Sequence, residues 1–191
     1  AFLAACYGFT EDEVKMLAER HNASMDNLKM WYDGYNIGRE KSIYNPYSVM
    51  KAIQRGSCRS YWTTTGAYDS VITYIQMNFD GLKDDIIRML AGERVYVNTS
   101  KFQNDMNIVR SKNDVLTVLI HLGYLAYDDE KQQCYVPNKE VTDELLNAVE
   151  DTSWKRLADA ITASRNLLDA TIAGNENAVA QAIDLAHDEN T

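Results

Sequence analysis

Apolar residues recur every three or four positions along most of this chain, which is the spacing of one face of an α-helix. The pattern predicts a mainly α protein. The helices are expected at about 11–21, 25–33, 46–55, 81–91, 113–122, 139–149 and 153–172, with a last one around Val179, Ile183 and Ala186.

Capping residues stand at several of the expected helix boundaries. Thr10 is followed three residues later by Glu13, which is the capping-box spacing. Asn45 and Pro46 are typical of an N-cap and the first helical residue. Further N-caps are expected at Ser24, Asp80, Ser111 or Asn113, and Asn138, and helix ends at Gly34, Gly56, Gly92, Gly123 and Gly174.

Extended segments are few and short. Val95–Val97 is the first, and residues 124–127 and 134–136 follow as two strands joined by the polar residues 128–132. We interpret the acidic run Asp128–Glu130 as a hairpin tip, because it lacks the spacing of a calcium loop. Helix, hairpin and helix in this order resemble part of a winged helix, here serving as a packing unit.

The balance of charge disfavours nucleic-acid binding in general. Lys and Arg number 19 against 28 Asp and Glu, giving a net charge of −9. A protein that binds DNA needs clustered cations, so a DNA site requires one locally basic face. The helix expected at 113–122 carries Val, Leu and Ile where a recognition helix carries polar residues. We therefore expect no DNA contact through it, and no apolar run is long enough to cross a membrane.

The three cysteines do not form a recognisable site. Cys6, Cys58 and Cys134 are far apart and without C-x-x-C spacing. Their pattern predicts neither a disulfide framework nor a zinc site, and we expect buried or half-buried reduced thiols in a cytoplasmic protein.

No catalytic, cofactor-binding or metal-binding residue is predicted. Phosphate loops and G-x-S-x-G elbows are missing from the sequence. Glu13 and Lys15 match the E-x-K of metal-dependent nucleases, but on a helix they point about 200° apart. We expect His21 and His121 to be satisfied core histidines and His187 to be exposed. The chain is expected not to be an enzyme by itself.

Aromatic residues are the remaining anomaly, with twelve tyrosines and three tryptophans. They cluster at Trp31, Tyr32, Tyr35, Tyr44, Tyr47, Tyr61, Trp62, Tyr68 and Tyr74. One interpretation is a stacking or partner-binding surface, and the other is an aromatic core with hydroxyls at its rim. We favour the core, because the clusters alternate with helix caps and not with Lys or Arg.

Three stretches together resemble a known family. They are Trp31–Asn36 followed by Ile43–Val49, then Tyr61–Thr65, then Leu119–Leu125 with Val136–Val141. The residues of these stretches and their order resemble those of the bacterial AAA-ATPase-like proteins, and the resemblance covers nearly the whole chain. In that family an ATPase-like region with a phosphate loop precedes this segment, and a PD-(D/E)XK nuclease-like domain follows it.

The resemblance implies the middle of such a protein, and the chain's first and last residues also suggest an excised piece. The implied order is a helical lid-like bundle (1–95), a winged-helix-like unit with a short β-hairpin (96–150), and a helical connector or C-terminal helical hairpin (151–191). Neither the phosphate loop nor the nuclease carboxylates lie in this chain, so no catalytic residue carries over. Arg39, Arg55 and Arg59 are the candidates to face a nucleotide, and no motif selects one.

The expected function is a non-catalytic connector between the ATPase-like and nuclease-like domains, which are its expected partners. The alternative is a protein-recognition module that binds a partner through a Tyr- and Trp-rich surface. A contiguous exposed aromatic patch would favour that alternative, and buried rings would count against it.

Overall fold

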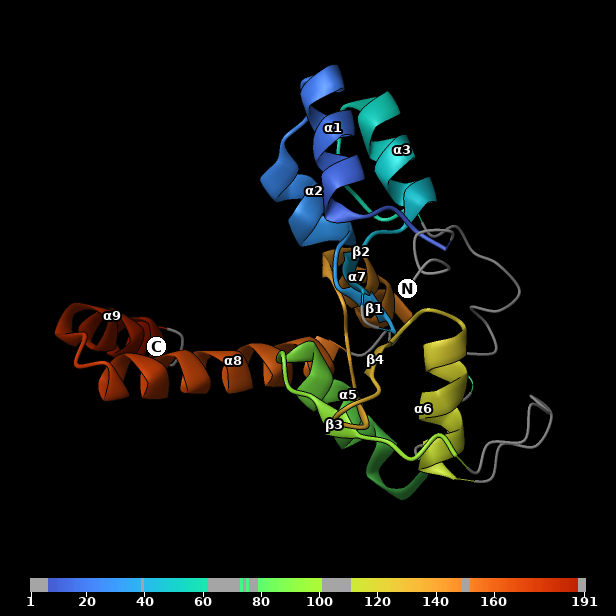
Figure 1. Cartoon of the computed structure of the whole chain (residues 1–191). Coiled ribbons are helices and arrows are strands. Elements are labelled where there is room, and N and C mark those ends of the chain that lie inside the picture. Colours follow the sequence, from blue (N-terminus) through green and yellow to red (C-terminus); the bar gives the residue numbers. More distant parts are fainter. Residues whose placement is uncertain are drawn as a thin grey trace.

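The computed structural model describes residues 7–38, 40–61, 73, 75, 79–100, 111–148 and 152–188. Helices dominate these residues and the strands are short, so the expectation of a mainly α protein is confirmed (Figure 1).

The N-terminal part contains three helices and a small hairpin. The helices are α1 (Glu11–His21), α2 (Met25–Tyr32) and α3 (Pro46–Arg55). Their predicted caps at Thr10, Ser24 and Asn45 are all confirmed. Between α2 and α3 lie the antiparallel strands β1 (Tyr35–Ile37) and β2 (Glu40–Ile43), so the prediction that Val95–Val97 is the first extended segment is wrong.

These helices enclose the first of two hydrophobic clusters. The first cluster consists of the buried residues Val14, Ala18, Leu28, Tyr32, Tyr44, Val49, Ala52 and Tyr61. Each helix contributes residues three or four positions apart, because that spacing aligns side chains along one face.

The second part mixes helices with a three-stranded sheet. A 3-10 turn, η2 (Phe79–Gly81), leads into α5 (Leu82–Leu90) and β3 (Val95–Tyr96). Next come α6 (Lys112–His121), the hairpin strands β4 (Ala126–Asp128) and β5 (Gln133–Tyr135), and α7 (Lys139–Ala148). The antiparallel order is β3-β5-β4, with Tyr127 opposite Cys134.

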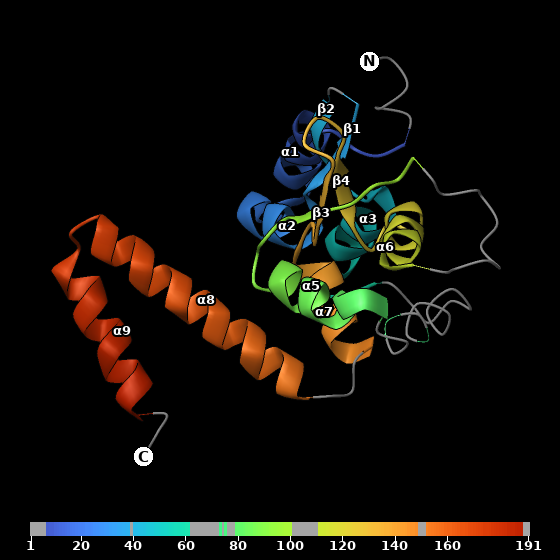
Figure 2. The ribbon, with the colours of Figure 1, turned by 90° about the horizontal axis from the view of Figure 1, so that it is seen from below.

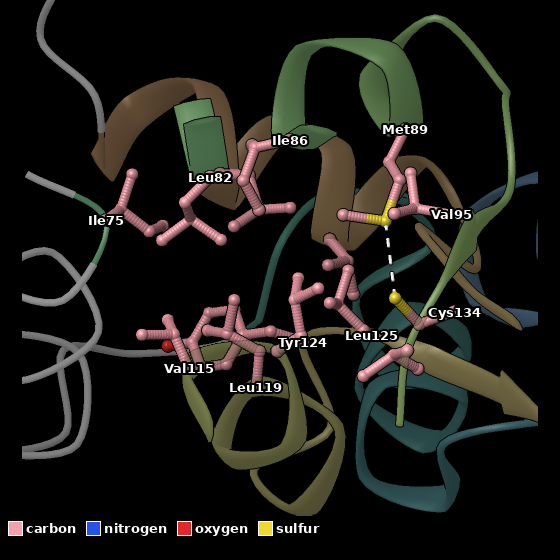
Figure 3. Close-up of a cluster of buried hydrophobic side chains, with 14 of the residues drawn as sticks. Ile75, Leu82, Ile86, Met89, Val95, Val115, Leu119, Tyr124, Leu125 and Cys134 are labelled. Atoms are coloured by element: carbon pink, nitrogen blue, oxygen red, sulfur yellow. Dashed lines mark hydrogen bonds between the residues drawn. The ribbon is translucent and has the colours of Figure 1, made fainter. Parts of the chain in front are cut away.

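The second cluster fills the space between α5, α6, α7 and this sheet. Leu82, Ile86 and Met89 of α5 face Leu119 of α6 and the following Leu125 (Figure 3). The thiol of Cys134 is buried and lies 3.7 Å from the sulfur of Met89. The cluster takes residues from both sides of position 95, and the division of the chain at 95/96 and 150/151 stays a prediction.

Two helix starts are settled by the structure. Ser111 caps α6 and exchanges capping-box hydrogen bonds with Asp114, which decides between the two expected starts. The prediction that Asp80 caps the next helix is wrong. Asp80 has a φ of 45° inside η2, and Gly81 occupies the N-cap of α5 without a side-chain hydrogen bond. An N-cap side chain can reach the first turn only from an extended backbone, which Asp80 does not have.

The last two helices form a hairpin that projects from the rest of the molecule (Figure 2). α8 (Thr152–Ile172) and α9 (Glu176–Asp188) reverse direction at Gly174, whose φ is 66°. Two described side chains anchor α8: Ile161 packs against the second cluster, and Arg165 donates to the carbonyl of Ala91 at 2.8 Å. The expected helical hairpin is confirmed, and none of the described helices is long and apolar enough to cross a membrane.

Candidate functional site

The two clusters meet along one polar seam, which we call the junction. It consists of Asp33–Asn36, Ser48, Tyr61, Gly123, Tyr135–Asn138 and Glu140. These residues come from five separate places in the sequence, and side-chain hydrogen bonds connect them across sequence separations of up to about a hundred residues.

A buried carboxylate stands at the centre of the junction. Glu140, in the first turn of α7, is 1% exposed. Its Oε1 atom accepts a hydrogen bond from the hydroxyl of Ser48 at 2.9 Å and another from the backbone N–H of Tyr61 at 2.8 Å. One turn later, Glu144 accepts a hydrogen bond from Ser60. The first turn of α7 is thereby tied to α3 and to the segment after it.

Burial sets the proton affinity of this carboxylate. Removal from water penalises the ionised form, and it raises the pKa of Glu140 to about 7. The two donated hydrogen bonds oppose that rise, and the neighbouring Glu144 adds to it by charge repulsion. Glu140 is therefore a buried group whose charge changes near neutral pH.

The second contact of the junction is a close approach of two backbones. A Cβ atom added to Gly34 would lie 2.1 Å from the carbonyl oxygen of Pro137, and the φ of Gly34 is +116°. The sequence predicts Gly34 as the end of α2, but Asp33 is the C-cap, with an ordinary φ of −77°. Gly34 is required by the approach of Pro137, a contact distant in sequence.

Side chains from both segments hold the two backbones together through hydrogen bonds. Asn138 donates to the carbonyl of Asp33 at 2.8 Å, and the Tyr135 hydroxyl donates to the carbonyl of Gly34 at 3.0 Å. The Asn36 amide donates to the Tyr135 hydroxyl at 2.7 Å. Asn138 also caps α7 through the N–H of Val141, as predicted. The helix cap and the junction therefore share one residue.

A third contact joins the hairpin β1–β2 to the end of α6. The hydroxyl of Tyr35 donates to the carbonyl of Gly123 at 2.8 Å, and burial raises the pKa of this phenol. Nearby, Arg94 lies 4.0 Å from the centroid of the Tyr135 ring and pairs with Asp128 at 3.1 Å. Asp128 is thus half of an ion pair and not only part of a polar tip.

A groove opens beside the junction. Its volume is about 490 Å³, and its walls include Tyr35, Asn36, Tyr44, Asn45, His121 and Tyr127. The hydroxyl of Tyr44 is buried and has no hydrogen-bond partner among the described residues. The groove combines rings and amides, and it contains no reactive pair of side chains.

The histidines do not behave as the sequence predicts. His21 and His121 are both exposed, so the expectation of core histidines is wrong for both. Each is the last residue of its helix, where a basic side chain is favoured by the partial negative charge of the helix terminus. The surroundings of His187 lie outside the described residues.

Other residues that the sequence analysis considered as site residues have structural surroundings or are exposed. The carboxylate of Glu13 accepts two hydrogen bonds from Thr10, both at 2.9 Å, and Lys15 is exposed. Cys58 is half-buried and Cys134 is buried, as predicted, while Cys6 and Arg39 lie outside the described residues. Across the part of the chain that the structure describes, no three or more His, Cys, Asp or Glu side chains converge as metal ligands would.

The tyrosines divide between core and surface. Tyr32, Tyr44 and Tyr61 are buried, which confirms the aromatic core for these rings, and Tyr124 is buried as well. The exposed ones are Tyr7, Tyr47 and Tyr96. The expected members Trp62, Tyr68 and Tyr74 lie outside the described residues.

Sequence reasoning assigned no role to Glu140 or Ser48. A signal was available for Glu140, because helical spacing places Glu140 and Glu144 next to the buried Val141 and Leu145. An acidic residue on the apolar side of a helix indicates a buried partner. Ser48 carried no comparable signal, since a serine after an N-cap is ordinary.

Part of the chain is similar to a known protein. The chain is 34% identical over 65 residues to a protein of Azotobacter chroococcum mcd 1 described as an uncharacterized protein in the vnfD 5′ region. That match covers 33% of this chain and 12% of the Azotobacter protein, so the chain matches about an eighth of that protein's length. No protein-family model and no solved structure matches the chain.

Proposed function

We propose that this chain is a non-catalytic helical segment that connects an ATPase-like and a nuclease-like domain within a longer, cytoplasmic AAA-ATPase-like protein. In this proposal residues 1–95 are the lid-like part, residues 96–150 the winged-helix-like unit and residues 151–191 the connector. The observation that carries it is the junction: parts of each stretch behind the family resemblance lie together in it, and its described polar groups hold the two clusters to each other.

The junction supports coupling because its contacts are buried and interdependent. Breaking the contact between Glu140 and Ser48 would leave the Ser48 hydroxyl without this partner, at about 1–3 kcal/mol for an unsatisfied buried group, and would leave the Glu140 carboxylate with the hydrogen bond from Tyr61 alone. The two clusters are therefore expected to move as one body. A displacement of α1–α3 then reaches α7 and α5, and through Arg165 it reaches the projecting α8–α9 hairpin.

The test uses the longer protein that contains this chain. Its nuclease rate on DNA is measured with and without ATP, in the wild type and in a Ser48→Ala, Glu140→Ala double variant. We expect ATP hydrolysis to persist and the effect of ATP on the nuclease rate to be lost, since the junction transmits the movement. Glu176→Ala, on the exposed side of the hairpin, is the matched control that removes a carboxylate elsewhere.

Two results would contradict the proposal. One is ATP hydrolysis by the 191-residue chain alone that a substitution inside it abolishes, because the chain would then hold its own reactive centre. The other is an unchanged ATP effect in the folded double variant. The alternative of a partner surface made of Tyr and Trp is less well supported, since Tyr32, Tyr44 and Tyr61 are buried.

A further inference from the structure

A row of cations follows α3 on the surface of this acidic protein. Lys51 and Arg55 lie one helical turn apart on α3, and Arg59 follows four residues later. Residues 41–61 contain no Asp or Glu, in a chain whose net charge is −9. None of the three cations forms an ion pair with a described residue, whereas Lys29, Arg88 and Arg94 do.

Tyrosine rings alternate with these cations. The Lys51 ammonium lies 5.5 Å from the centroid of the Tyr47 ring. The guanidinium carbons of Arg55 and Arg59 lie 5.7 Å and 5.3 Å from the centroid of Tyr61. The sequence argument that the aromatic clusters do not alternate with Lys or Arg therefore fails at this surface. The alternation arises only when residue 61 folds back beside α3.

The segment that carries Arg59 is fixed in place. The hydroxyl of Tyr32 donates to the carbonyl of Arg59 at 2.9 Å and accepts from its N–H at 3.0 Å. The hydroxyl of Tyr61 donates to the carbonyl of Ser57 at 2.6 Å. Because its backbone is already ordered, little further ordering is needed when Arg59 binds an anion.

Two carboxylates bind the segment that carries Arg59, and neither forms an ion pair with Arg55 or Arg59. Glu140 accepts hydrogen bonds from the hydroxyl of Ser48 and from the N–H of Tyr61, and Glu144 accepts one from Ser60. Arg55 and Arg59 are exposed, so their guanidinium groups are accessible to an external anion.

We infer that Tyr47, Lys51, Arg55 and Arg59, which we call the α3 row, bind single-stranded nucleic acid. Lys51 and Arg55 lie one helical turn apart and Arg59 shares the Tyr61 ring with Arg55, so the three cations are spread over more than one phosphate position, which suits the repeated phosphates of a strand better than one compact anion. The Tyr47 ring is 55% exposed and offers a face on which an unpaired base can stack. A duplex keeps its bases stacked inside, and the carboxylates that would bind an acidic peptide to these cations offer no ring to stack on Tyr47. This surface is separate from α6, for which we expect no contact with DNA.

The test is fluorescence anisotropy of a labelled 15-nucleotide oligo-dT titrated with the complete 191-residue chain. Neutralising three phosphates predicts a slope of log K against log salt of about −2 for a single strand. Binding should therefore weaken roughly 15- to 20-fold between 50 and 200 mM salt.

Variants separate the two components of the α3 row. Arg55→Ala with Arg59→Ala should weaken binding on the order of 50-fold at 50 mM salt and reduce the slope to about −0.7. Tyr47→Leu should weaken binding by about fivefold or more while leaving the slope unchanged. Arg20→Ala on α1 removes another exposed cation and is the matched control, with no change expected. Thermal melting of each variant shows whether it is folded.

Several outcomes would overturn the inference. These are no binding of oligo-dT at 50 mM salt, equal losses in the double variant and in Arg20→Ala, or equal affinity for a duplex of the same length. Displacement of oligo-dT by inorganic tripolyphosphate, together with an unaffected Tyr47→Leu variant, would indicate a site for phosphate alone.

Discussion

Replacing Glu140 by Gln removes the charge from the centre of the junction and leaves its shape almost unchanged. The amide oxygen of Gln can still accept hydrogen bonds from Ser48 and from the N–H of Tyr61. The change therefore isolates the electrostatic contribution of a carboxylate that is 1% exposed.

The magnitude follows from the pKa. Burial raises the pKa of Glu140 from 4.5 to about 7, and each pKa unit corresponds to about 1.4 kcal/mol. Below pH 4.5 the group is protonated in both states and destabilises nothing. As pH rises toward 7 the unfolded chain loses this proton first, so the folded state is progressively disfavoured. The full effect is about 3 kcal/mol and is complete above pH 7.

The assay is urea denaturation followed by circular dichroism, for wild type and Glu140→Gln between pH 4 and 8. The quantity of interest is the free energy of unfolding of the wild type minus that of the variant. This difference should fall by about 3 kcal/mol as pH rises through the window. Taking a difference cancels the titration of the other carboxylates, and Glu19→Gln on α1 sets the baseline for losing one negative charge.

The reasoning would be refuted by a difference that is flat with pH or that rises with it. A flat difference would mean that the carboxylate is as well solvated in the folded state as in the unfolded chain. A rising one would mean that the hydrogen bonds from Ser48 and Tyr61 outweigh burial.

Three further predictions concern packing. Leu119→Ala should lower the free energy of unfolding by about 2–5 kcal/mol, because Leu119 is fully buried in the second cluster; a loss below about 1 kcal/mol by chemical denaturation would contradict that placement. Gly34→Ala should destabilise by at least about 2 kcal/mol, since its Cβ would meet Pro137, whereas Gly38→Ala, with open space around it, should lose only about 1 kcal/mol. Equal losses in the two glycine variants would show that backbone conformation alone matters. Arg165→Ala should speed hydrogen exchange in α8, and unchanged exchange there would show that the hydrogen bonds from Arg165 to the Ala91 carbonyl and the Glu93 carboxylate do not anchor the helix.

Local sequence signals located most of the secondary structure. The capping box at Thr10, the Asn45–Pro46 start and the Asn138 cap all function as predicted, and Ser111 is one of the two expected starts of its helix. These signals succeed because a helix boundary depends on hydrogen bonds between residues two or three positions apart. Where a backbone departs from the expected conformation, as at Asp80, the same signal fails.

The junction could not be predicted in this way. Glu140 accepts a hydrogen bond from Ser48, 92 residues away in the sequence, and Gly34 lies against the carbonyl of Pro137, about a hundred residues away. No short-range pattern encodes such pairs. The family resemblance marks stretches that contain these residues, but the sequence does not predict that they contact each other.

The sequence by itself determined that the chain is mainly helical, where most of its helices begin, and that Cys58 and Cys134 are buried or half-buried. Spacing and caps decide those features over a few residues of chain. Tertiary structure alone decided that Glu140 is a buried carboxylate with a raised pKa, that Gly34 serves a backbone contact, and that Arg55 and Arg59 share one tyrosine ring. Burial and charge environment depend on which distant segments come together, because both are set by everything within a few ångströms of an atom and not by its neighbours in sequence.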